Sequence, residues 1–132
     1  MKFMLLVIPK GYENAAPGTM PEADAVAEMM KFNQALKDAG VLRALDGLHP
    51  PSMGARVSFK GGKASVTDGP FTETHEVLGG YWIIEVASKA DAVAWAKRAP
   101  MADNEIIEVR QVMQEEDFPD DVKAATAGFD GL

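Results

Sequence analysis

Apolar residues recur along the chain in patterns typical of strands in a sheet. Residues 2–8 are apolar on both faces apart from Lys2, which predicts a strand in the centre of a sheet. Three later segments, 41–48, 81–86 and 105–113, are the other sheet strands that the pattern predicts.

Two further segments have the 3.6-residue periodicity of amphipathic helices. The first begins at Thr19, whose spacing from Glu22 suits a capping box, and stops at Gly40. The second is capped by Ser88 and stops at Pro100. The apolar stripes that would pack on a sheet are Ala25, Met29, Phe32 and Leu36 in the first helix, and Ala92, Trp95, Ala96 and Ala99 in the second.

A β-hairpin interrupts this succession. Segments 56–60 and 63–67 flank a Gly-Gly pair, which can adopt positive φ twice in a two-residue turn. The resulting register gathers four apolar side chains on one face, namely Val57, Phe59, Ala64 and Val66. The opposite face is polar, so we expect the hairpin to lie half-exposed.

The order of elements predicts an α+β fold: a ferredoxin-like sheet with an inserted β-hairpin and helices on one face. The side of the last two strands that meets the helices would carry Trp82, Ile84, Val86, Ile107, Val109 and Met113. The open side would carry Tyr81, Ile83, Glu85, Ile106, Glu108, Arg110 and Val112. A mixed face of this kind is usually covered by a partner subunit, so we predict a homodimer. The charges on it are either ordinary solvated groups or the lining of a cavity.

Length and cysteine usage limit the class of protein. The 132 residues correspond to one domain. The chain has no cysteine, which rules out disulfides and thiolate chemistry. The apolar run at 3–8 is shorter than a signal peptide or a membrane span requires. We therefore expect a cytoplasmic protein that is not inserted into a membrane.

Negative charge is concentrated in the second half of the chain. The net charge is −7; residues 1–66 carry eight basic and six acidic side chains, and residues 67–132 carry five and fourteen. An acidic protein without a basic stripe repels phosphate backbones, so nucleic acid is not an expected partner. We interpret residues 119–132 as an acidic C-terminal tail in solvent.

Residues 66–73, which read Val-Thr-Asp-Gly-Pro-Phe-Thr-Glu, and the later Leu-Gly-Gly-Tyr of 78–81 resemble the DGPF-signature branch of the YCII-related family. The similarity extends through nearly all of residues 1–118, including the segments 47–50, 54–57, 94–96 and 107–110. This resemblance implies a dimeric α+β barrel, in which two sheets meet through their open faces. Genes of this kind often lie beside extracytoplasmic-function sigma factors, which implies a regulatory link. The branch itself has no settled reaction.

Two departures from the family pattern limit what the resemblance implies. His75 stands where family members often carry lysine. Better-understood YCII relatives, including a dehydrochlorinase, share a His-Asp pair with the histidine on the first helix. Residues 22–39 contain no histidine, so that pair cannot be transferred to this chain.

Seven residues are candidates for a site. Asp68, followed by Gly-Pro, is a candidate catalytic carboxylate, although aspartate also begins turns for purely structural reasons. His75 is a second catalytic candidate, because histidine is the residue type most often used for acid–base chemistry at neutral pH, and the chain has only two, His49 and His75. The candidate ligand-binding residues are His49, Tyr81, Glu85, Glu108 and Arg110. No metal-ligand spacing and no nucleotide-binding motif is present, so we predict no metal and no cofactor.

Three functions of different classes remain open. The first is a sensor or accessory protein that binds a small molecule in the barrel, and this is the function we favour. The second is a cofactor-free lyase or isomerase with Asp68, a histidine or Glu85 as general base. The third is a purely structural interaction module. Saturable ligand binding separates the first two from the third, and turnover separates the second from the first.

Overall fold

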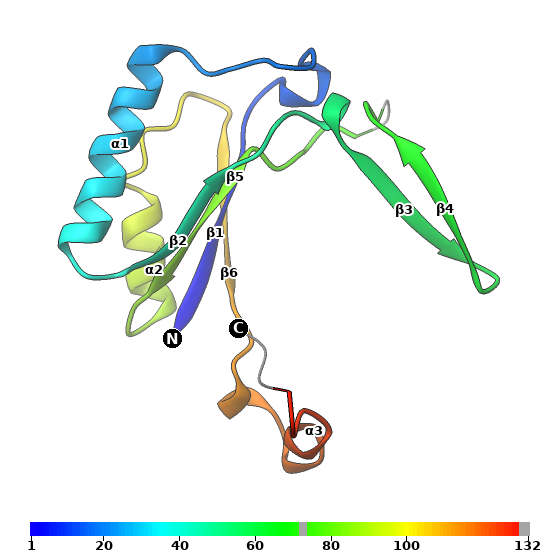
Figure 1. Ribbon diagram of the computed structural model, residues 1–132. Helices are drawn as coiled ribbons and strands as arrows, with labels where there is room; N and C mark the ends of the chain where they lie inside the picture. Colours follow the sequence, from blue (N-terminus) through cyan, green and yellow to red (C-terminus); the bar gives the residue numbers. More distant parts are fainter. Residues whose placement is uncertain (72–73, 130–132) are drawn as a thin grey trace.

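A computed structural model describes residues 1–71 and 74–129 as a four-stranded antiparallel sheet with two helices on one face (Figure 1). The strands lie in the order β2-β5-β1-β6. Their bounds are Lys2–Ile8 for β1, Leu42–Gly47 for β2, Gly80–Glu85 for β5 and Ile106–Gln111 for β6. The helices are α1 (Ala23–Asp38) and α2 (Lys89–Ala96). This order confirms the predicted ferredoxin-like α+β sheet and the central place of β1.

The core lies between the sheet and the helices. Phe3 and Leu5 of β1 and Ile84 of β5 are buried on the side that the helices cover. Phe32 of α1 meets Trp82 of β5 edge to face, with 5.1 Å between ring centroids. The predicted stripes are confirmed except at Ala25, which is exposed in the first turns of α1. The prediction that Met113 faces the helices is wrong, because β6 ends at Gln111 and Met113 is exposed beyond it.

Of the two predicted helix caps, one is wrong and one is confirmed. The predicted capping box at Thr19 is wrong, because α1 begins at Ala23 with Glu22 as its N-cap. The Thr19 hydroxyl instead donates to the Ala16 carbonyl at 2.6 Å, which closes the turn before the helix. The cap of α2 is confirmed, since the Ser88 hydroxyl accepts a hydrogen bond from the Asp91 amide at 3.2 Å.

The hairpin consists of β3 (Ala55–Lys60) and β4 (Lys63–Asp68), with the register expected from the sequence. Gly61 and Gly62 have φ of 59° and 75°, as a two-residue turn with positive φ requires. The prediction of half-exposure is wrong, because every residue of both strands is exposed. The hairpin extends away from the sheet in Figure 1, so the body of the chain covers neither face.

Short elements complete the described part of the chain. Three 3₁₀ turns span Tyr12–Asn14 (η1), Pro51–Met53 (η2) and Glu115–Asp117 (η3), and a short helix, α3, spans Asp120–Ala125. η3 and α3 lie below the sheet in Figure 1, where the chain leaves β6. Among the described residues, no helix has the length and apolar character needed to cross a membrane.

Replacing Asn33 with alanine is expected to lower the free energy of unfolding by about 1–3 kcal/mol. The Asn33 side-chain oxygen accepts a hydrogen bond from the indole N–H of Trp82 at 2.7 Å, and the indole is buried in the core. The substitution leaves that donor without its partner. Gln34→Ala is the matched control, because Gln34 bonds Asp38 at 2.7 Å on the exposed side of the same helix. Urea denaturation measures the free energy of unfolding of both variants. If the two variants lose the same amount, the buried hydrogen bond has no special role.

Candidate functional site

The open sheet face carries its side chains in rows that cross the strands. Residues directly opposite one another on neighbouring strands share a face. One row contains Asp46, Tyr81, Leu6 and Glu108; the next contains Ala44, Ile83, Met4 and Arg110. In the row beyond, Glu85 lies opposite Lys2. The face therefore has an apolar centre, with Asp46 and Glu108 at the two ends of the first row and Arg110 at one end of the second.

The phenol of Tyr81 is held by a carboxylate on the neighbouring strand. Its hydroxyl donates a hydrogen bond to Asp46 Oδ2 at 2.9 Å. This hydrogen bond and the negative charge of Asp46 raise the pKa of Tyr81 above its usual value. The phenol thus stays protonated across the physiological range, and it is a hydrogen-bonding group rather than a base.

Two ion pairs flank the apolar centre. Arg43 Nε lies 3.7 Å from a carboxylate oxygen of Glu85, and an Arg110 guanidinium nitrogen lies 3.2 Å from one of Glu108. The Arg110 and Glu108 side chains are 70% and 47% exposed, so this pair adds little stability while the face is open to water. With Lys2 and Asp46, the face carries three basic and three acidic groups. A second copy of this balanced face can approach without the repulsion that the net charge of the chain suggests.

The predicted site residue His49 lies at a different place, beside the base of the hairpin. It lines an open pocket of about 340 Å³ together with Arg56, Phe71 and Glu76. The Arg56 guanidinium lies 4.2 Å above the Phe71 ring and donates to the Thr74 hydroxyl at 3.0 Å. These two contacts fix the position of the guanidinium at the wall of the pocket.

The two catalytic candidates lie at the margin of this pocket. Asp68 is the last residue of β4, is exposed, and lies opposite Ala55, which lines the pocket. His75 is exposed too and directly precedes Glu76 in the chain. Within residues 1–71 and 74–129, no hydrogen bond or ion pair joins the Asp68 carboxylate to His75. The described structure therefore shows no catalytic dyad formed by Asp68 and His75.

The motif residue Gly69 has a packing role. A Cβ built at this position would lie 1.7 Å from the carbonyl oxygen of Pro51. The Gly69 amide also donates to the Gly54 carbonyl at 2.9 Å. Only glycine allows the backbone after β4 to come this close to η2, so the motif holds the base of the hairpin against the body.

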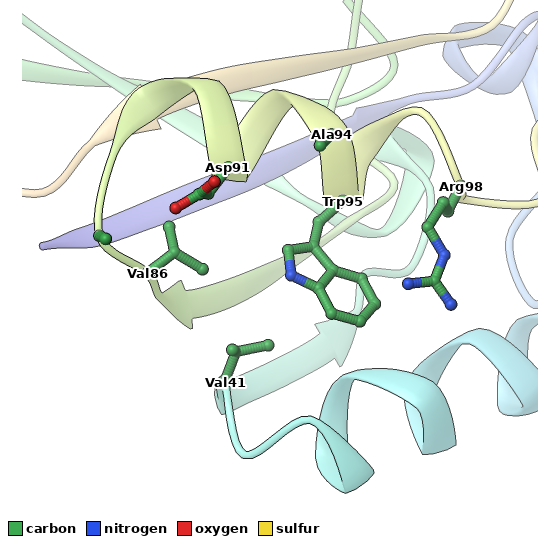
Figure 2. A pocket seen from close by; sticks show the side chains of 7 residues that line it. Val41, Val86, Asp91, Ala94, Trp95 and Arg98 are labelled. Carbon is green, nitrogen blue, oxygen red and sulfur yellow. The ribbon is translucent and has the colours of Figure 1, made fainter.

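A second hollow lies on the helix side, away from the predicted site residues. It measures about 430 Å³ and is lined by side chains of α2 and of the segments next to it (Figure 2). Figure 2 shows Arg98 beside Trp95, with the guanidinium 4.3 Å from the ring centroid. Asp91 lies toward the other end of α2. The lining of this hollow contains none of the seven candidates.

The structure thus brings four of the seven candidates, Tyr81, Glu85, Glu108 and Arg110, onto one face. Two further residues of this face, Asp46 and Arg43, were not among the candidates; Asp46 accepts the Tyr81 hydrogen bond and Arg43 forms an ion pair with Glu85. The alternation of apolar and polar residues along segment 41–48 indicates in part which of its side chains lie on the open face. The register irregularity between Leu42 and Ala44 shifts the pairing, however, and no local pattern reveals such a shift.

Comparison with known proteins agrees with this fold. The YCII-related domain matches residues 1–116. An uncharacterized protein of Rhizobium meliloti (strain 1021) is 37% identical over 60 residues, which cover 46% of this chain and 48% of that relative. This match spans about half the length of each protein and carries no named activity. The match over residues 1–116 shows that the chain belongs to the YCII-related family.

Proposed function

We propose that this protein is a DGPF-branch member that binds a small molecule between the open sheet faces of two copies. Its role would be that of a cytoplasmic accessory or regulatory protein. The observation that carries the proposal is the arrangement around Ile83 and Met4, where an apolar centre lies between the Tyr81–Asp46 hydrogen bond and the Arg110–Glu108 pair. Binding sites combine an apolar lining with a few convergent polar groups in this way.

Dimerisation would turn this shallow face into an enclosed site. In one copy the ion pairs are open to solvent and weak. A second sheet laid over them would exclude water, which strengthens the hydrogen bonds and charge interactions available to a ligand. The ligand that fits has an apolar body of modest size and polar substituents that reach Tyr81 or Arg110.

Binding has more support than catalysis. A general base has to reach the proton it removes, in a site shielded from bulk water. Asp68 and both histidines are exposed and lie off the sheet face, and the raised pKa of Tyr81 makes the phenol a donor. A regulatory link to a sigma factor rests on the branch resemblance alone, and the acidic chain is consistent with a protein partner rather than nucleic acid.

A screen of small metabolites for thermal stabilisation, followed by calorimetric titration of the hits, tests this function. We expect a saturable ligand, and the variant Tyr81→Phe with Arg110→Gln should bind it at least about tenfold more weakly, since one lost hydrogen bond is worth about 1.4 kcal/mol. Asp68→Asn is the matched comparison; it should fold and keep most of its affinity. If Asp68→Asn instead loses more affinity than the double variant, or if the parent protein converts the ligand to a product, the result would favour the lyase or isomerase.

A further inference from the structure

The hairpin presents an uncovered apolar face to solvent. Val57, Phe59 and Val66 are 53%, 79% and 68% exposed on the same side of the two strands. A two-stranded hairpin without a packed face is only marginally stable in water. The basic residues Arg56, Lys60 and Lys63 lie on the opposite face of the hairpin, and Asp68, at the base, is the hairpin's single acidic residue.

The C-terminal segment, residues 113–129, has complementary properties. It carries five carboxylates and one lysine, and Met113 and Phe129 are 77% and 80% exposed. The segment surrounds a hollow of about 440 Å³ that is lined in part by Phe118 and Phe129. It therefore offers negative charge and an aromatic-lined recess on the same short stretch of chain.

In one copy these two parts lie at opposite ends of the sheet. The hairpin connects Gly47 of β2 to Gly80 of β5, which are paired at one end. The C-terminal segment follows Gln111, which pairs with Phe3 near the other end. Figure 1 shows them leaving the body in different directions, so the two parts of one copy do not meet each other.

We propose that in the homodimer the hairpin of each copy packs against the C-terminal segment of the other copy. The inference rests on the face-to-face dimer of the proposed function. A two-fold axis that lies between the sheets and runs across the strands places the hairpin end of one sheet over the tail end of its partner. Phe59 and its apolar neighbours then lose water against the recess around Phe118 and Phe129. Lys60 and Lys63, on the outer face of the hairpin tip, give the tip a positive charge that attracts the acidic segment.

The absence of cysteine from the sequence allows a direct test. Chains carrying Lys60→Cys and Asp120→Cys are co-expressed with different affinity tags and purified in tandem, so that only mixed dimers remain. A short bismaleimide is expected to link most of these dimers. Pairing Lys31→Cys with Asp120→Cys is the matched control, because Lys31 is an exposed lysine on the outer side of α1. In this control pair the bismaleimide should link few dimers.

The outcomes of this experiment separate the two proposals. Mixed dimers that form but cross-link no better than the control would overturn the hairpin contact and leave the sheet-face dimer standing. Failure to obtain any mixed dimer would overturn both. Cross-linking in a protein that binds no small molecule would support the contact while removing the proposed function.

Charge reversal checks the same contact by a second route. Lys60→Glu with Lys63→Glu should raise the dimer dissociation constant at least about tenfold, and adding Asp120→Lys with Asp121→Lys should restore most of the loss. Lys89→Glu with Lys97→Glu makes the same change in net charge elsewhere and should leave the constant within about twofold of the parent. If both lysine pairs raise the dimer dissociation constant equally, and the added aspartate-to-lysine changes do not lower it again, the effect is general charge repulsion and the contact is contradicted.

Discussion

Replacing Ile83 with glutamate is expected to convert the proposed dimer into monomers at micromolar concentration. Ile83 lies in the middle of the open face, opposite Met4 on one side and Ala44 on the other. A carboxylate in the apolar centre of an interface must lose its water without gaining a partner, which costs several kcal/mol. The dimer dissociation constant should therefore rise at least about a hundredfold, since each 1.4 kcal/mol is worth about tenfold. Sedimentation equilibrium measures the change directly.

Val26→Glu is the control for this prediction, because Val26 is an exposed apolar residue on α1, across the core from the open face. It should remain dimeric with an unchanged dissociation constant. Circular dichroism should show native folding of both variants, since Ile83 lies on the side of the sheet away from the core cluster. An Ile83 variant that stays dimeric, while the hairpin charge variants dissociate, would locate the dimer contact at the hairpin alone.

Gly69→Ala is expected to detach the base of the hairpin from the body. The added methyl group would lie 1.7 Å from the Pro51 carbonyl oxygen and 2.6 Å from the Pro51 carbonyl carbon, so the backbone has to move. Overpacking against rigid backbone costs about 1–3 kcal/mol or more of the free energy of unfolding. Urea denaturation should report this loss, and hydrogen exchange at the Gly69 amide should accelerate as its bond to Gly54 opens.

Gly54→Ala tests whether the effect belongs to Gly69 or to any glycine near η2. A Cβ at Gly54 would lie 3.6 Å from the same Pro51 oxygen, an ordinary contact, and its φ of −119° suits alanine. We expect the free energy of unfolding to stay within about 0.5 kcal/mol of the parent. If Gly69→Ala unfolds at the parent's urea concentration, the close approach to Pro51 cannot explain the glycine of the motif.

The Gly69 result bears on the Asp-Gly-Pro-Phe motif as a whole. Gly69 fits under the Pro51 carbonyl and Phe71 lies under Arg56, so two of its four residues have packing roles. These contacts join the hairpin to η2 and to the pocket wall that contains His49. The motif by itself is thus weak support for catalysis at Asp68.

Local patterns were sufficient to predict the elements and much of their arrangement. The stripe at Phe32 and Leu36 and the doubly apolar strand at 2–8 depend on the period of a single element. The stripe lies in the core, and the strand lies inside the sheet, as expected. The hairpin register follows from the two glycines, whose positive φ leaves one way to pair the strands. In the four-stranded sheet, burial on one side fixes the register as well, because a one-residue slip would expose the whole apolar set.

The tertiary structure decided which side chains meet. Asp46 and Tyr81 are 35 residues apart in sequence and meet across β2 and β5, next to a strand whose register shifts at Ala44. The alternation of the hairpin predicted that one face is covered, yet both faces are exposed. An amphipathic pattern indicates an apolar face that would be stabilised by burial, but it does not indicate which chain buries it. Contacts between distant segments depend on how whole elements are placed, and a period of two or 3.6 residues contains no information about that placement.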